Sequence, residues 1–207
     1  MFAHRTAVHL EQLSLETEVR AITRMDGLRA ATRRLFAVAD REEIRFVERC
    51  VAFARQWHLT TPARVVSRLG NGWLYPVAAA ILFLSSFQSA ARCIIAAGGS
   101  LALAFTVYPP LKRFLARRRP CDYDRSLIDA TKSLDRYACP SGHAMTAAAF
   151  GVPMIFAAPL AAAPVVIVGC VIVSWSRLAL GHHYLSDLVI GTLLGAIIAS
   201  LVAAFVV

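Results

Sequence analysis

Acidic residues are scarce in this sequence, and they form no cluster of carboxylates of the kind that holds a metal ion. The chain has 207 residues, with 22 Lys and Arg against 13 Asp and Glu, and a formal net charge of +9. A charge of this sign is common in nucleic-acid-binding proteins. However, no motif of that class is present, and basic and acidic residues alternate in the N-terminal third. We therefore expect no nucleic-acid partner, and we attribute the charge to a membrane surface and an anion site.

A secretory signal peptide, a long repeat and a low-complexity tract are also missing from the sequence. The first thirty residues contain Glu11, Glu16, Glu18 and Asp26 and lack the apolar stretch that a signal peptide needs. The composition argues against an ordinary soluble domain, because 57% of the residues are hydrophobic and they concentrate after residue 72. Membrane insertion would therefore rely on internal segments.

Five apolar stretches follow the turn sequence at residues 69–72. Each stretch is close to the roughly 20 residues that cross the hydrocarbon core of a bilayer. Trp73 and Tyr75 are placed like anchors at the membrane interface. Gly191 and Gly195 form a small-residue face that is suited to close helix packing. The predicted spans cover residues 73–91, 93–111, 142–160, 161–180 and 186–207.

Residues 35–58 have the length of a further span but carry eight charged side chains. A central charge costs roughly 2.5–3.5 kcal/mol on insertion, so a lipid-facing span is unfavourable. The apolar residues lie on one side, which predicts an amphipathic helix on the membrane surface or against the bundle, or equally a soluble helix packed on a neighbour. The sequence thus predicts an all-α, polytopic transmembrane bundle of five spans, or six if 35–58 crosses. A basic amphipathic N-terminal helical region (1–68) would precede a membrane-embedded domain (69–207).

Three short polar blocks interrupt the apolar part of the chain, each at the predicted end of a span. Because successive spans alternate in direction, all three blocks meet at one face of the membrane. The blocks are Lys112 with Arg119-Pro120, then Pro140-Ser141-Gly142-His143, and then Ser176-Arg177 with His183 and Asp187.

Each block also has a purely structural interpretation when it is taken alone. A pair of cations seven residues apart projects from one helix face, but it also anchors many spans. Ser141 and Gly142 open an apolar helix whose free N–H groups could bind an anion, or Ser141 is an ordinary N-cap. Arg177 could simply extend towards the membrane interface, as basic residues near span ends often do.

His183 and Asp187 are four residues apart, which makes them neighbours at a helix start. Asp187 could accept a hydrogen bond from Nδ1–H of His183 and leave Nε2 free to attack an electrophile. Alone, such a pair is more often structural. Arg113, Arg117 and Arg118 are interpreted as a basic membrane flank.

Taken together, in this order and spacing, the blocks resemble the type 2 phosphatidic acid phosphatase (PAP2) family of membrane lipid phosphatases. The family pattern is Lys-x6-Arg-Pro, Pro-Ser-Gly-His and Ser-Arg-x5-His-x3-Asp, and residues 112–187 match every position of it. The resemblance covers about residues 70–207 and leaves out the N-terminal third.

The resemblance implies hydrolysis of a lipid phosphate through a phosphohistidine, with no metal and no other cofactor. His183 would be the nucleophile, Asp187 its orienting group, and His143 the acid and base. The phosphate would be bound by Lys112, Arg119, Ser141, Gly142 and Arg177.

The resemblance leaves the lipid and the membrane side open. Undecaprenyl diphosphate, phosphatidylglycerol phosphate, phosphatidic acid and lipid A phosphates are all candidates, and a prenyl diphosphate is our first expectation. Family members usually face the periplasm of a bacterial inner membrane. With five spans, however, the positive-inside rule favours a cytoplasmic site. The sequence gives no indication of oligomeric state.

Other interpretations remain open at this stage. A non-catalytic lipid-binding or transport protein would explain an anion pocket but not both histidines. A vanadate-dependent haloperoxidase shares such a pocket, but those relatives are larger and soluble. Cys121 and Cys139 border the site, and we expect free thiols, with a disulfide as the alternative in an oxidising compartment.

Overall fold

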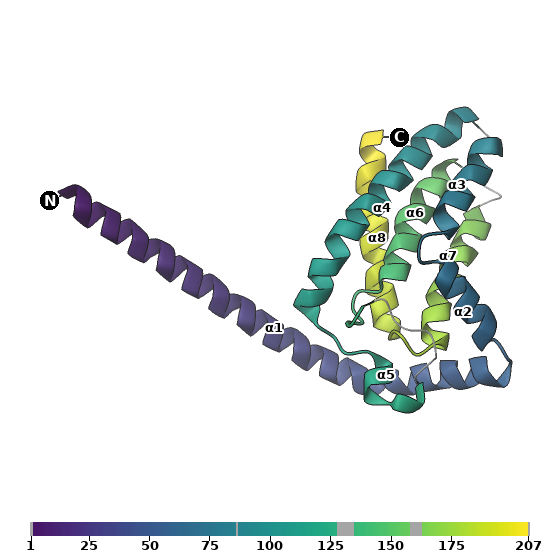
Figure 1. Cartoon of the computed structure of the whole chain (residues 1–207), viewed down its shortest axis with the longest axis horizontal. Helices are drawn as coiled ribbons and strands as arrows, with labels where there is room; N and C mark the ends of the chain where they lie inside the picture. Colours follow the sequence, from purple (N-terminus) through teal and green to yellow (C-terminus); the bar gives the residue numbers. More distant parts are fainter. Residues whose placement is uncertain (1, 86, 128–134, 158–162, 207) are drawn as a thin grey trace. The chain divides into compact units, whose positions relative to one another are not determined.

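The computed structural model describes residues 2–85, 87–127, 135–157 and 163–206, and all regular elements among them are helices. The all-α prediction is therefore confirmed. The chain divides into two compact units, Met1–Ala39 and Asp40–Val207, whereas the predicted boundary after residue 68 stays a prediction. The elements are α1 (Phe2–Gln56), α2 (Thr60–Leu69), α3 (Leu74–Ser85), α4 (Phe87–Leu115), α5 (Pro120–Tyr123), a 3-10 turn (Arg125–Leu127), α6 (Gly142–Ala157), α7 (Ala163–Ala179) and α8 (Leu185–Val206) (Figure 1).

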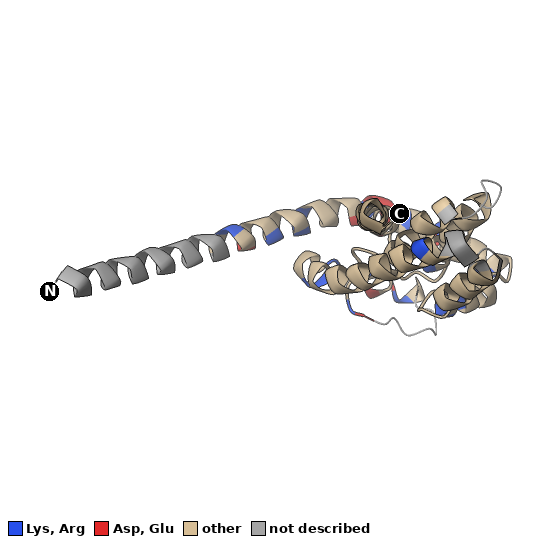
Figure 2. Cartoon of the chain, turned by 90° about the horizontal axis from the view of Figure 1, so that it is seen from above, with Lys and Arg blue, Asp and Glu red and all other residues tan. Residues whose placement is uncertain are grey.

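The helix α1 is longer than the sequence suggested, because it runs unbroken from Phe2 to Gln56. Its first part belongs to the smaller unit. Within residues 23–39 this part carries four arginines and one aspartate (Figure 2). Its exposed surface is basic and also carries the apolar side chains of Met25, Leu28, Leu35 and Val38.

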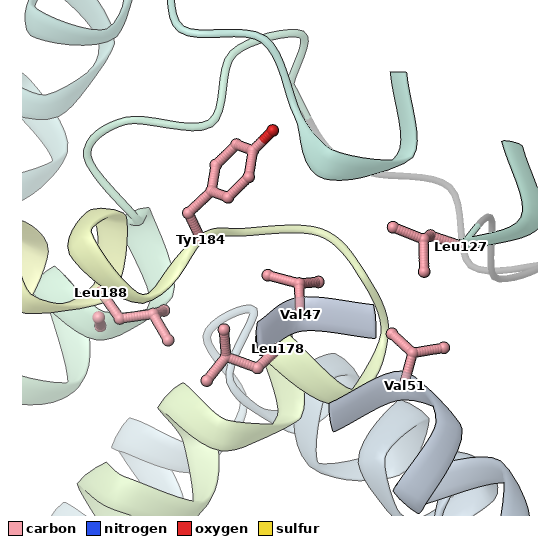
Figure 3. Packing of buried hydrophobic residues seen from close by; sticks show 7 residues of the cluster. Val47, Val51, Leu127, Leu178, Tyr184 and Leu188 are labelled. Carbon is pink, nitrogen blue, oxygen red and sulfur yellow. The ribbon is translucent and has the colours of Figure 1, made fainter. Parts of the chain in front are cut away.

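Residues 40–56 of α1 belong to the larger unit and lie across one end of its helices (Figure 1). Val47 and Val51 are buried there, while Arg41, Arg45 and Glu48 are exposed, so the segment is amphipathic as predicted. The two valines pack in a cluster with Leu127, Leu178, Tyr184 and Leu188 (Figure 3).

The helix α6 lies at the centre of the larger unit and packs against α4, α7 and α8. Ser141 begins α6 as its cap, with Oγ 3.5 Å from the N–H of Ala144. The glycine face of α8 lies directly against α6, as the sequence predicts. A Cβ atom at Gly191 would be 2.5 Å from the Ser141 carbonyl oxygen, and one at Gly195 would collide with the carbonyl of Met145. Close helix contact therefore requires glycine at both positions.

The exposed surface of the helices is strongly apolar. Val165 and Val171 on α7 and Phe205 on α8 are among many large hydrophobic side chains that point outward. Among the described residues, two stretches are long and apolar enough to cross a membrane: Ala91–Tyr123, which contains most of α4, and Leu185–Val206, which is α8. Five spans therefore stay a prediction.

The first predicted span differs most from the structure. The helix α3 ends at Ser85 and α4 begins at Phe87, so the predicted stretch 73–91 is divided between two helices. Trp73 is exposed, as a membrane anchor would be. Tyr75 instead points inward, with its hydroxyl 2.7 Å from the hydroxyl of Thr146, because a buried phenol needs a polar partner.

Replacing Gly195 with Ala should destabilise the bundle, because the added methyl group meets the backbone of α6. We expect a loss of about 1–3 kcal/mol in the free energy of unfolding, the usual cost of overpacking. Thermal unfolding of the detergent-solubilised protein, followed by circular dichroism, measures the change. Gly169→Ala on α7 is the matched control, since no atom lies within 4 Å of its added Cβ. Equal unfolding midpoints for the two variants would contradict the close contact.

Candidate active site

A cavity beside the N-terminus of α6 brings together side chains from all three polar blocks. It is lined by Lys112 from α4, His143 from α6 and Arg177 from α7, together with Arg119 and His183 from connecting segments. Gly142 is also part of the wall. The remaining lining residues are Gly70, Asn71, Phe105, Tyr108, Asp135 and Thr146.

Three buried cations dominate the charge of this cavity. Lys112, Arg119 and Arg177 are only 3%, 3% and 5% exposed. The expectation that Lys112 and Arg119 share a helix face is wrong, because α4 ends at Leu115. The chain instead leaves the helix at Ala116, which has a positive φ of 47°, and the extended segment that follows returns Arg119 to the cavity.

Asp135 is the carboxylate that pairs with two of the cations. Its Oδ2 accepts a hydrogen bond from Nζ of Lys112 at 2.7 Å, and its Oδ1 accepts one from NH2 of Arg119 at 2.5 Å. Burial raises the pKa of Asp135, but Lys112 and Arg119 outweigh it and hold the pKa below its usual range. Among the residues that the structure describes, Arg177 has no carboxylate partner. A buried, uncompensated guanidinium of this kind is suited to binding an anion.

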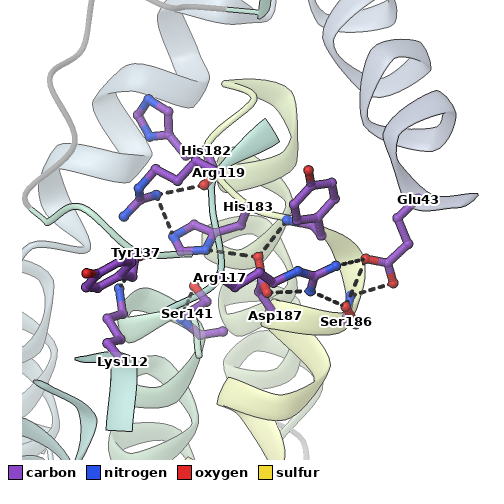
Figure 4. A network of polar contacts seen from close by, with 12 residues as sticks. Glu43, Lys112, Arg117, Arg119, Tyr137, Ser141, His182, His183, Ser186 and Asp187 are labelled. Atoms are coloured by element: carbon purple, nitrogen blue, oxygen red, sulfur yellow. Dashed lines mark hydrogen bonds and ion pairs between the residues drawn. The ribbon is translucent and has the colours of Figure 1, made fainter. Parts of the chain in front are cut away.

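The tautomer of His183 follows from its neighbours. Nε2 lies 3.2 Å from NH1 of Arg119. A guanidinium can only donate, so Nε2 is the acceptor and the proton is on Nδ1. Burial, followed by the charges of Arg119 and Arg177, lowers the pKa of His183 well below its usual range. His183 is therefore neutral, with an unprotonated Nε2 directed at the cationic cavity (Figure 4).

Asp187 lies behind His183, away from the cavity. Its Oδ2 is 3.6 Å from Nδ1 of His183 and accepts a hydrogen bond from the N–H of Tyr184 at 2.9 Å. The helix α8 begins at Leu185, so the contact depends on the chain entering the helix rather than on helical spacing. Asp187 thereby caps α8 and faces the Nδ1 proton, at a distance slightly longer than a hydrogen bond.

Arg117 belongs to this support, and its interpretation as a membrane flank is wrong. Its side chain is fully buried, and its NH1 donates to Oδ1 of Asp187 at 2.6 Å. On its other side it contacts carboxylate oxygens of Asp40 at 2.8 Å and Glu43 at 3.0 Å, both from α1. Glu43 also accepts a hydrogen bond from the hydroxyl of Ser186 (Figure 4). Arg117 therefore ties Asp187 to α1.

His143 and Arg177 share a partner that the motifs do not contain. Nε2 of His143 donates to the backbone oxygen of Ser67 at 3.0 Å, because a carbonyl can only accept. NH1 of Arg177 donates to the hydroxyl of the same residue. Ser67 lies near the end of α2, which has no motif residue. Its position therefore fixes two predicted site residues from outside the family pattern.

Ser141 is placed differently from the expectation that it donates to an anion. It caps α6, and its own N–H donates to the backbone oxygen of Asp187 at 3.0 Å. It is not among the residues that line the described cavity. Cys121 and Cys139 are both free thiols, and burial raises the pKa of Cys139 well above its usual range.

Arg117→Leu should lower the free energy of unfolding by about 3–5 kcal/mol, because it leaves buried carboxylates without their cation. Arg118→Leu is the control, since Arg118 is exposed and adjacent in the chain. The unfolding midpoints of both variants in detergent measure the difference. Similar midpoints would mean that the buried pairs contribute nothing to stability.

Comparison with known proteins assigns the chain to a family. The PAP2 superfamily model matches residues 93–207. The structure is similar to that of the first transmembrane PAP2 type phosphatidylglycerolphosphate phosphatase from Bacillus subtilis, with a TM-score of 0.61, 19% identity, and coverage of 86% of this chain and 94% of the other. It is also similar to Aquifex aeolicus LpxE, with a TM-score of 0.58, 18% identity, and coverage of 78% and 94%.

At these identities the two structures establish a shared fold and nothing finer. The family match carries more weight, because it spans more than half of the chain and contains every residue of the three polar blocks. The protein therefore belongs to the PAP2 superfamily.

Proposed function

We propose that the protein hydrolyses a terminal phosphate monoester or diphosphate of a membrane lipid through a phosphohistidine at His183. The observation that carries this proposal is the buried guanidinium of Arg177, which has no carboxylate partner in the described part of the chain and lines the same cavity as His183. Among the described residues that line the cavity, Lys112, Arg119 and Arg177 are three cations, against the single carboxylate of Asp135. This excess of two positive charges matches a phosphate monoester, which carries −1.5 to −2 at neutral pH.

In the first step, the lone pair on Nε2 of His183 attacks phosphorus, and the bond from phosphorus to the lipid-side oxygen breaks. Before this attack, the NH1 group of Arg119 must turn from Nε2 of His183 to a phosphate oxygen, because its hydrogen bond occupies the lone pair. His143 protonates the departing oxygen, and for this step it must enter the reaction with a second proton, on Nδ1, because its Nε2–H is bound to the Ser67 carbonyl. Asp187 stabilises the positive charge that develops on the His183 ring, as its position near Nδ1 allows.

In the second step, His143 takes a proton from water, and the resulting hydroxide attacks phosphorus. The bond from phosphorus to Nε2 breaks, inorganic phosphate leaves, and His183 regains its lone pair. The three cations stabilise the transferring phosphoryl group in both steps, so the mechanism needs no metal ion. Gly142 contributes the N-terminus of α6 to the same anion site, whereas Ser141 caps that helix.

The lipid is proposed at the level of its class. One of the two similar structures is a phosphatidylglycerolphosphate phosphatase, which supports a phosphatidylglycerol phosphate as substrate. A lipid A phosphate is a further candidate from the family resemblance. Undecaprenyl diphosphate remains our first expectation, with phosphatidic acid as a further candidate. These four lipids form the panel for the test below.

His183→Ala should lower phosphate release from the best substrate of this panel by at least about 10³-fold, because the nucleophile is lost. Phosphate release by purified protein in detergent, measured with a metal chelator present, should be unaffected by the chelator. His143→Ala should accumulate an acid-labile phosphoryl group on His183, visible by mass spectrometry. The exposed His58, replaced by Asn to suit its positive φ of 54°, is the control. Undiminished turnover by His183→Ala would contradict a phosphohistidine at His183, whereas no phosphate release by the parent would favour a protein that only binds the lipid.

We further propose that the active site faces the periplasm of a bacterial inner membrane, as is usual in this family. The basic residues of the N-terminal third argue for the opposite side under the positive-inside rule. The helix α8 leads from His183 to the far end of the bundle (Figure 1). A periplasmic site therefore predicts a cytoplasmic C-terminus.

A cysteine introduced after residue 207 should react with a membrane-permeant thiol reagent only, in cells that express a variant lacking the native cysteines. Labelling by an impermeant reagent would place the C-terminus outside and the active site in the cytoplasm.

A further inference from the structure

Asp135 is outside all three motifs, yet it forms ion pairs with Lys112 and Arg119, two of the cations that bind the phosphate in the proposed function. Both of its carboxylate oxygens are used, one by Lys112 and the other by Arg119. The backbone adds two more contacts, because Nε of Arg119 donates to the oxygen of Asp135 at 3.2 Å and Nζ of Lys112 donates to that of Tyr137 at 3.3 Å. The Asp135 carboxylate is thus held in the cavity wall by side-chain and backbone contacts.

The donors that remain for a phosphate can be counted. Arg119 has five N–H groups. Its contacts use one on Nε, two on NH1 with His182 and His183, and one on NH2 with Asp135. Lys112 has three donors and uses two. With the contacts of the described residues counted, a phosphate finds one donor on each of these cations unless it displaces the carboxylate.

Displacement is favoured by geometry and by charge. The side chain of Asp135 is 35% exposed, whereas those of Lys112 and Arg119 are 4% and 3% exposed. The carboxylate therefore lies on the solvent side of the cations and can leave without unfolding the wall. An incoming anion first finds Arg177, the cation without a carboxylate partner among the described residues, and then competes for Lys112 and Arg119. Two negative charges compete better than one, because both anions contact the same donors.

We propose that Asp135 is a specificity-determining residue, an internal anion that a phosphate monoester or diphosphate displaces and a phosphodiester does not. The inference rests on the proposed function, because it takes Lys112 and Arg119 as phosphate ligands. A bilayer consists mainly of phosphodiester lipids, whose phosphate carries a single negative charge. The carboxylate excludes these abundant lipids from the cations, and it lowers the affinity for the product phosphate in the same way.

Asp135→Asn tests this proposal, because it removes the charge and keeps the shape. The affinity for inorganic phosphate is measured from phosphate-dependent thermal stabilisation, which requires no turnover. We expect Asp135→Asn to bind phosphate about tenfold more tightly, which corresponds to about 1.4 kcal/mol. Phosphatidylglycerol in mixed micelles should become a competitive inhibitor of this variant and not of the parent.

Two further variants complete the design. Asp135→Glu keeps the charge and should retain the parental phosphate affinity. Asp124→Asn removes an exposed charge that is paired with Ser126 outside the cavity, and it should change neither property. Weaker or unchanged phosphate binding by Asp135→Asn would overturn the proposal and show that the carboxylate only positions the two cations. If the parent hydrolyses no lipid phosphate while Asp135→Asn still binds phosphate more tightly, the proposed function fails and the role of Asp135 stands.

Discussion

The cost of burying charge in an apolar bundle governs the arrangement of this protein. Desolvating an ion costs several kcal/mol, and this cost is offset only when the buried ion is paired with an opposite charge. The buried charge of Arg117 is paired on both sides, with Asp187 and with two carboxylates from α1. The buried charges of the cavity are paired only in part, since Asp135 pairs with two of its three cations. Arg117 and its three carboxylate partners are therefore held by ion pairs, whereas the cavity keeps a positive excess that an anion can compensate.

The sequence predicts the meeting of the three polar blocks for a simple reason. Spans that alternate in direction bring their ends together at one face, and helix ends are where Lys112, His143 and Arg177 lie. The local geometry was less predictable. Helical spacing was expected to unite Lys112 with Arg119 and His183 with Asp187, but in both cases a non-helical segment makes the contact. Residue order determines which groups meet, whereas backbone turns determine how they meet.

The partners that hold the site could not be found from the sequence. Ser67 is 110 residues from Arg177, and Asp40 is 77 residues from Arg117. Serine and aspartate are common in exposed positions, and no spacing rule connects residues that meet only through tertiary packing. One signal was present: the apolar side of the α1 segment, which includes Val47 and Val51, predicted a helix on the membrane surface or packed against a neighbour. The sequence does not identify that neighbour, because Arg117 looks like Arg113 and Arg118.

Because Ser67 contacts His143 and Arg177, the segment that contains the motifs is shorter than the segment that holds the site together. A fragment that starts where the family match starts, at residue 93, would retain every residue of the three blocks. It would lose the carbonyl that orients the His143 ring and the hydroxyl that fixes Arg177. It would also lose the two α1 carboxylates that neutralise Arg117. The smallest autonomous unit of this chain that keeps these contacts therefore includes the helices that precede its signature.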